Sequence, residues 1–402
     1  MKPNALSQFD DENFSLSNDL KQLKKVIDSN AIEAIVFYSG RILEATSNYC
    51  VNTLGEKSNN NVFSNIEHIN DYNLLDLVTR HWAHGLRRLA NQFRHILKPT
   101  EINDGVIAVI LLNSWLDWLI NKSQLVDNNQ EQFTLCSDEK SEINKQLHWI
   151  NNWLQHKNFH ELSNQQESTL LKQPIFSAVI CEELINKKEF IVASEYLEIS
   201  QNSHPNDLRL LQLQGLLLSR TNQLKKAEQI LRSLLKKFPN DDETIGILAG
   251  VYKKMWQMGD EGKLQTWGKL YKKGWLQSKE RNTYLGINAA AYALWIGEKE
   301  NSIEIASNIV NQYQKRQKVL MDTLKLPTNK MDYWDQATLA EAQLLANEVE
   351  QAESYYYDLF TAKHYVNQPH EIAAKQLAHH LSFLDEQKYS KLLDLAEEFM
   401  TN

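Results

Sequence analysis

The sequence predicts an all-α protein, in which an N-terminal antiparallel four-helix bundle is followed by an α-solenoid of helical hairpins. Three observations support this fold class. Only seven Pro and thirteen Gly occur in 402 residues, which is too few for a turn-rich β fold. In long stretches, apolar residues recur about every 3.6 positions, as they do on amphipathic helices. In the second half, residues of similar size also recur 34 positions apart, as in stacked hairpins.

The first domain is predicted over residues 18–125, after a flexible N-terminus of residues 1–17. Helical periodicity between about Leu20 and Gly55 fits one long helix or two in series. A shorter helix follows in VFSNIEHINDYNLLD. A basic helix then ends before Pro99, because a proline disfavours the helical conformation of the residue before it. With the apolar helix GVIAVILLNSWLDWLI, these segments indicate an antiparallel bundle.

Residues 126–145 are polar and acidic, and they are predicted to connect the bundle to a repeat domain of residues 146–400. Five pairs of residues lie 34 positions apart: Pro205 and Pro239, Ala193 and Ala227, Leu197 and Leu231, Cys181 and Gly215, and Leu184 and Leu218. This spacing is the tetratricopeptide period, and the small residues Gly215 and Ala227 would let two helices approach closely. The hairpins are predicted within 174–241, where the repeats are clearest, and at 282–310 and 333–362.

Composition limits the function classes. A net charge of −8 argues against wholesale binding to nucleic acid or membranes, although it allows a local basic patch. The most apolar stretch is interrupted by polar residues and short for a bilayer, so it is expected to be a core helix. The polar N-terminus and the scattered cysteines Cys50, Cys136 and Cys181, expected to be buried thiols, favour the cytoplasm. The chain has no nucleotide-binding or metal-ligand motif, so neither a cofactor nor a metal is predicted.

The segment from Arg80 to Lys98 carries five basic side chains and no acidic one. On a helix that advances about 100° per residue, Arg87, Asn91 and His95 share one face, and Arg88 lies close to His95. Such a face can simply be solvated, or it can tie helices together through hydrogen bonds. It can also bind phosphate or RNA, for which the basic residues suited are Arg80, Arg88, Arg94 and Lys98.

The same face also suits a metal-independent ribonuclease that uses the ribose 2′-hydroxyl as nucleophile. His95 could transfer protons, and Arg87 or Arg88 could hold the negative charge that develops on phosphorus. Asn91 could orient the imidazole or the phosphate. From the residues alone, the catalytic, binding and structural interpretations all stay open.

Leu86, Arg87, Asn91 and His95 form an L-R-x3-N-x3-H pattern, and with the four-helix prediction the bundle resembles the HEPN superfamily. Many HEPN domains are metal-independent ribonucleases, whereas others only dimerise or bind partners. The resemblance therefore implies either function, and a composite active site would require a homodimer formed through the bundle.

The ordered segments DLRLLQLQGLLLSR, NDDETIGILAGVYKKMW, TYLGINAAAYAL and DYWDQATLAEAQLL lie within about 175–385. They resemble the tetratricopeptide-like TRAFs-binding region of the MAP kinase kinase kinase family, which also occurs in bacterial proteins. The resemblance implies a regulatory or sensor scaffold and supplies no catalytic residues.

The first hypothesis is accordingly a cytoplasmic scaffold of a bacterial stress or phage-defence type system, which binds a protein partner or a small ligand on its solenoid. The alternative is a HEPN ribonuclease regulated by the solenoid. Of the histidines near the C-terminus, His379 and His380 are expected to be an exposed and a half-buried residue without a function. The aromatic residues of the repeats are expected to belong mostly to the core: Trp256, Trp267, Trp275, Trp295, Trp334 and 355–357.

Overall fold

The computed structural model describes residues 9–10, 14–58, 61–94, 102–126, 174–326, 331–362, 370–384 and 388–400. Every regular element in these ranges is a helix, which confirms the predicted all-α class. The chain divides into two compact units, residues 1–187 with 319–327 and residues 188–318 with 328–402. Of the connector predicted at 126–145, only Val126 lies within the described residues.

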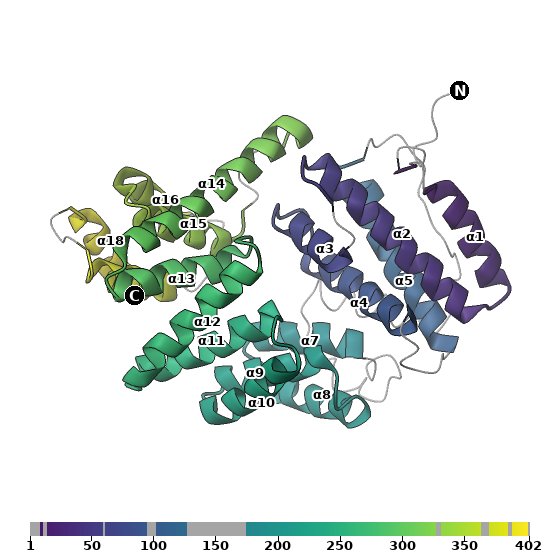
Figure 1. The fold of residues 1–402 in the computed structure, drawn as a ribbon, viewed down its shortest axis with the longest axis horizontal. Coiled ribbons are helices and arrows are strands. Elements are labelled where there is room, and N and C mark those ends of the chain that lie inside the picture. The colour runs from purple at the N-terminus through teal and green to yellow at the C-terminus, as the bar shows by residue number, and fades with distance from the viewer. Residues whose placement is uncertain are drawn as a thin grey trace. The chain divides into compact units, whose positions relative to one another are not determined.

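The helices of the first unit are α1 (Leu16–Asp28), α2 (Ile32–Thr53), α3 (Val62–Asn70), α4 (Leu77–Arg94), α5 (Ile102–Asp117) with the π-helical turn η2 (Trp118–Lys122), and α7 (Pro174–Asn186). The segment that allowed one helix or two is thus two helices. Ser15 caps α1 by accepting a hydrogen bond from the backbone N–H of Asn18, and Asn30 turns the chain with a φ of 52°. α2 packs against α1, α3, α4 and α5 (Figure 1).

The apolar helix α5 provides much of the core of the first unit. Trp115 is buried and donates its indole N–H to Thr46 Oγ1 at 2.9 Å, and Trp118 donates to the carbonyl of Leu74 at 2.9 Å. Residues 104–122 are long and apolar enough to cross a membrane by length and composition, but 67% of that window is buried inside the protein. The helix therefore lies in the core of the first unit, as predicted.

The second unit begins with α8 (Phe190–Ser203) and continues as five helical hairpins. Their first helices are α9 (Leu208–Arg220), α11 (Asp242–Gln257), α13 (Thr283–Trp295), α15 (Tyr333–Leu345) and α17 (His370–Leu381). Their second helices are α10 (Leu224–Lys237), α12 (Leu264–Gln277) after the 3-10 turn η4 (Glu261–Lys263), α14 (Lys299–Leu324), α16 (Val349–Thr361) and α18 (Ser390–Met400).

The same local sequence signals begin and end these hairpins. Four first helices start after an Asp or Asn whose side chain accepts a hydrogen bond from the backbone N–H three residues later: Asp207, Asp241, Asn282 and Asp332. Four turns between paired helices use an Asn or Gly with positive φ, which such turns favour: Asn222, Gly259, Gly297 and Asn347.

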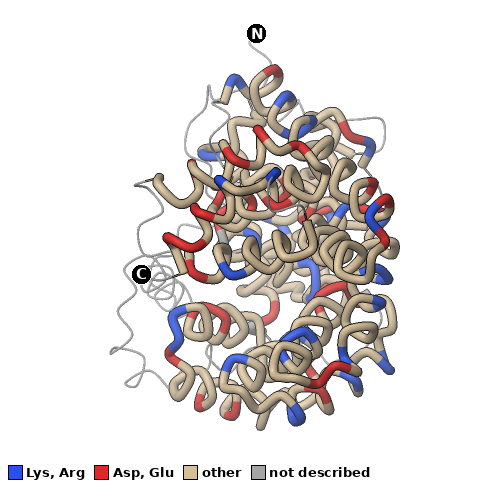
Figure 2. The backbone as a smooth tube through the Cα atoms, turned by 90° about the vertical axis from the view of Figure 1, so that its left-hand side faces the viewer, with Lys and Arg blue, Asp and Glu red and all other residues tan. Residues whose placement is uncertain are grey.

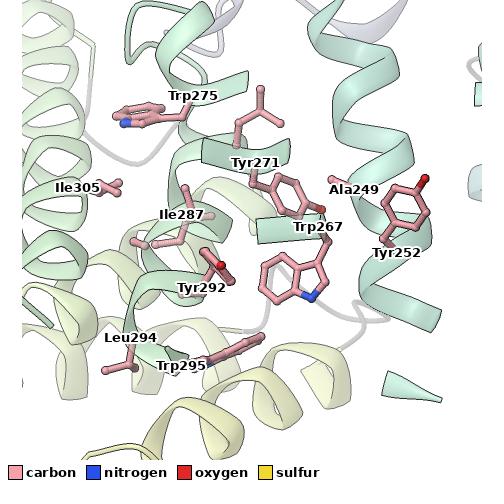
Figure 3. Close-up of a cluster of buried hydrophobic side chains, with 14 of the residues drawn as sticks. Ala249, Tyr252, Trp267, Tyr271, Trp275, Ile287, Tyr292, Leu294, Trp295 and Ile305 are labelled. Atoms are coloured by element: carbon pink, nitrogen blue, oxygen red, sulfur yellow. The ribbon is translucent and has the colours of Figure 1, made fainter. Parts of the chain in front are cut away.

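Small residues bring the paired helices together, as the repeat spacing predicts. A Cβ atom added to Gly215 on α9 would lie 2.7 Å from Leu231 Cγ on α10. Between successive hairpins, one built on Gly268 of α12 would lie 2.2 Å from the ring of Tyr292 on α13. Figure 3 shows how large aromatic side chains of α12 and α13, among them Trp267 and Trp295, fill the core between the helices.

Most of the other predictions about side-chain burial agree with the structure. Cys50 and Cys181 are buried thiols whose pKa burial raises, whereas Cys136 lies outside the described residues. The prediction that the aromatic residues are core is wrong for Trp334 and Tyr357, because about half of each side chain is exposed. Basic and acidic residues are interspersed along the described chain (Figure 2).

Candidate functional site

The basic helix α4 uses part of its charge inside the first unit. Arg80 forms a bidentate ion pair with Glu67 of α3, with Nε to Oε1 at 2.9 Å and Nη2 to Oε2 at 2.6 Å. His84 Nε2 lies 2.7 Å from Glu67 Oε1. Arg80, predicted to bind RNA or phosphate, thus ties α4 to α3.

Burial and these contacts fix the charges of the cluster. Burial tends to raise the pKa of Glu67, but Arg80 and His84 outweigh it and hold that pKa well below its ordinary value. Burial lowers the pKa of His84 to about 4, against the opposing effect of Glu67. His84 is therefore neutral near pH 7 and donates its Nε2–H to an ionised Glu67.

The other predicted residues of α4 are only partly described. Arg87, Arg88 and Asn91 are half-buried, and the Arg87 guanidinium lies 5.3 Å from the centre of the Phe63 ring. His95 and Lys98 lie outside the described residues, and of Arg94 only the backbone at the end of α4 is described. The structure therefore brings Arg87, Arg88 and Asn91 to one helix without testing the full Arg, Asn and His arrangement.

In the second unit, exposed side chains recur at the start of successive first helices. Tyr284 on α13 is 54% exposed, Trp334 on α15 is 49% exposed and Ile372 on α17 is 55% exposed. We call these three residues the exposed edge. Large side chains of this kind, left in water, are frequent at protein interaction sites.

Hydrogen bonds join the helix starts beneath this edge. Tyr313 of α14 lies between α13 and α15, with its hydroxyl 3.4 Å from Thr283 Oγ1 and donating to Asp335 Oδ1 at 2.7 Å. Tyr333 of α15 and His370 of α17 are 3.2 Å apart, from hydroxyl to Nδ1. The helix starts that carry the three exposed side chains are therefore joined to one another by hydrogen bonds.

A second feature is a polar network buried between first helices. Lys253 Nζ on α11 donates to Asn288 Oδ1 on α13 at 3.0 Å and to Gln376 Oε1 on α17 at 3.1 Å. Gln376 in turn donates to Glu341 Oε1 on α15 at 3.0 Å, and His380 Nε2 lies 2.8 Å from the same oxygen. Four first helices are thus linked through one chain of hydrogen bonds.

His380 is fixed in one tautomer by its two neighbours. Its Nδ1 accepts from the indole N–H of Trp295 at 3.1 Å, so Nε2 carries the proton donated to Glu341. Burial tends to raise the pKa of Glu341, but His380, Lys253 and Gln376 outweigh it and lower that pKa. The prediction that His380 is half-buried is wrong, since its side chain is 0% exposed. His379, predicted to be exposed, is half-buried against Trp295. That neither histidine has a function stays a prediction.

Sequence reasoning missed both features for different reasons. The repeat period contains a signal for the network, because Lys253 to Asn288 and Glu341 to Gln376 are each 35 residues apart, close to one repeat. The contact of Lys253 with Gln376 spans 123 residues and has no local signal. The exposed edge occupies the second or third position of each helix, which apolar periodicity assigns to the core.

Comparisons with known proteins agree with the repeat architecture. The model of the tetratricopeptide repeats-sensor family matches residues 189–293, so this region consists of tetratricopeptide-type repeats. No curated protein matches the chain. The resemblances to the TRAFs-binding region and to the HEPN superfamily stay predictions.

Three solved structures are similar at low identity. A thermophilic tetratricopeptide repeat protein of Thermus thermophilus is 13% identical, with a TM-score of 0.37 over 52% of this chain and 97% of that chain. The type IV pilus biogenesis factor PilW is 12% identical, with a TM-score of 0.34 over 56% and 91%. A tetratricopeptide repeat protein of Parabacteroides merdae is 13% identical, with a TM-score of 0.28 over 54% and 96%.

Proposed function

We propose that the chain is a regulatory scaffold whose tetratricopeptide-type repeats bind a protein partner along the exposed edge. The observation that carries this proposal is the recurrence of Tyr284, Trp334 and Ile372 at the starts of three successive first helices, each about half exposed. Side chains that recur with the repeat offer a partner contacts on several hairpins. Because the name of the matched family contains the word sensor, we also propose that partner binding responds to a signal.

The charges beside the edge indicate what the partner presents. Asp332 and Asp335 both lie at the start of α15, next to Trp334, and burial together with the charge of Asp335 raises the pKa of Asp332. A cation brought to these carboxylates would relieve their repulsion. We therefore propose that the partner docks a segment in which an apolar side chain stands next to a Lys or Arg.

The test places a photo-crosslinking amino acid at Trp334 and, as a control, at Ile191, which is 78% exposed on α8 and lies away from the edge. A partner crosslinked in cell extract at position 334 alone is then purified. Its affinity should fall about tenfold or more for Trp334→Ala and for Ile372→Ala, and stay unchanged for Ile191→Ala. Equal affinity of all three variants would contradict the proposal.

A second function proposed from the sequence is RNA cleavage by α4. It rests on the sequence pattern of Arg87, Asn91 and His95; in the structure Arg87, Arg88 and Asn91 are half-buried on α4, so part of each side chain is accessible. Wild type should cleave labelled RNA in EDTA and leave 2′,3′-cyclic phosphate ends, and His95→Ala should lose the activity while keeping its melting temperature. If wild type does not cleave the RNA, or if both proteins cleave it equally, this function is contradicted.

A further inference from the structure

Charge is divided unevenly along the repeats, although both signs occur along their whole length. Residues 208–279, which form the first two hairpins, carry fourteen Lys or Arg and six Asp or Glu. Residues 280–347 carry seven and eight, and residues 348–402 carry four and ten. The repeats of this acidic chain therefore have one basic end and one acidic end.

At the basic end, the second helices α10 and α12 lie side by side. Lys263, just before α12, lies 3.4 Å from Glu228 of α10, and Gln277 at the end of α12 donates to Asn240 after α10 at 2.8 Å. α12 contains three Lys and no acidic residue, and Glu228 is the one acidic residue of α10. We call five exposed side chains of these two helices the basic face: Arg232, Lys236, Lys269, Lys272 and Leu276.

At the acidic end, helix α16 contains three acidic residues and no basic one. Glu353 is already paired within the chain, because its Oε2 accepts from Lys391 Nζ of α18 at 3.1 Å. Glu350, Tyr357 and Asp358 are exposed, and their spacing of seven and eight residues places them on one side of the helix. We call these three residues the acidic face.

The two faces are complementary in composition. On α12, Lys269 and Leu276 are seven residues apart, as Glu350 and Tyr357 are on α16. Leu276 is 56% exposed and Tyr357 is 59% exposed. Each face thus combines charges of one sign with one large side chain that can be buried, and the signs are opposite. Protein interfaces commonly consist of such an apolar contact surrounded by complementary charges.

We propose that the chain self-associates by packing the basic face of one copy against the acidic face of another. The lysines of α12 then meet the carboxylates of α16, and Leu276 packs beside Tyr357. The contact joins unlike surfaces, so every copy offers both halves of it. It shares no residue with the exposed edge or with α4, so it is independent of partner binding and of RNA cleavage.

Sedimentation velocity of the full chain tests the proposal. Wild type should self-associate at about 50 mM salt and about tenfold more weakly at about 500 mM salt, because salt screens exposed charges. Lys269→Glu with Lys272→Glu, and separately Glu350→Lys with Asp358→Lys, should each weaken association at least about tenfold, since like charges then face each other. An equal mixture of the two variants should associate again, because the acidic surfaces of one meet the basic surfaces of the other.

The matched control is Lys21→Glu with Lys24→Glu, two exposed lysines with the same spacing on α1. It changes the net charge by the same amount and should associate like wild type. A monomeric wild type at about 50 mM salt would overturn the proposal, and its binding to polyglutamate would assign the basic face to another acidic partner. Variants that associate like wild type, or a mixture that stays monomeric, would also overturn it.

Discussion

Glu341 is the side chain on which the buried network depends most. It accepts hydrogen bonds from Gln376 and His380, and its charge offsets that of Lys253, whose pKa burial lowers. Glu341→Ala leaves these groups buried without their acceptor, so we expect a loss of about 3 kcal/mol in the free energy of unfolding. Urea unfolding followed by tryptophan fluorescence measures this loss.

The matched control is Glu350→Ala, since Glu350 is an exposed carboxylate on the neighbouring helix α16. We expect its free energy of unfolding to change by less than about 0.5 kcal/mol. If both variants lose the same amount, Glu341 contributes no more than a surface residue, and the network is not a source of stability.

His84 makes the stability of the first unit depend on pH. Burial lowers its pKa in the folded state from 6.5 to about 4, so in this range the unfolded chain binds more protons than the folded one. Stability is therefore fully present above about pH 6.5 and decreases as the pH falls toward 4, by up to about 1.4 kcal/mol per pH unit. Glu67 stays ionised throughout, because its own folded pKa lies lower still.

His84→Asn tests this origin, because Asn keeps an N–H donor for Glu67 but does not titrate. Hydrogen exchange of peptides from α4, corrected for the intrinsic exchange rate, should show a steep pH dependence in wild type and a flatter one in the variant. The same slope in both proteins would assign the pH dependence to other groups.

At the scale of elements, two glycines of the repeats should respond in opposite directions to the same substitution. Gly215→Ala places a Cβ atom 2.7 Å from Leu231 Cγ, so α9 and α10 must separate, at a cost of about 1–3 kcal/mol. Gly250→Ala on α11 meets only Tyr271 Oη at 3.8 Å, and it should stabilise the helix by about 0.5–1 kcal/mol. Thermal unfolding of both variants checks the sign, and two changes of equal sign would contradict the close-approach role of Gly215.

The same contrast explains which elements the sequence could predict. Capping residues such as Asp241, turn residues such as Asn222 and the small residue Gly215 act on neighbours within one hairpin, so their patterns are visible locally. Trp334 has the size and helical position of a core residue, and only the packing of the next hairpin decides that it stays exposed. In the first unit, no pattern showed that Arg80 and His84 would share Glu67, because the pairing depends on how α3 meets α4.

Considered as a whole, the second unit departs from a simple solenoid, in which each repeat contacts only its neighbours. Lys253 on α11 bonds to Gln376 on α17, and the Trp256 and His379 rings of the same helices lie 5.6 Å apart. Helix α13 also contacts α17 directly. Helix α17 of the last hairpin thus contacts α11 of the second hairpin. We therefore expect stability to be shared among repeats that are distant in sequence.

This shared stability predicts how far a local change spreads. The double variant Gln376→Ala with His380→Ala removes the hydrogen bonds that join α17 to α11, α13 and α15, so backbone hydrogen exchange should become faster in α11 as well as in α15 and α17. Leu392→Ala opens a cavity in α18, where Leu392 is fully buried, without touching the network, and it should leave α11 protected. Exchange measured by mass spectrometry separates these helices. If α11 exchanges as slowly in the double variant as in Leu392→Ala, coupling in the repeats runs only between neighbours, and the network joins the helices without transmitting stability.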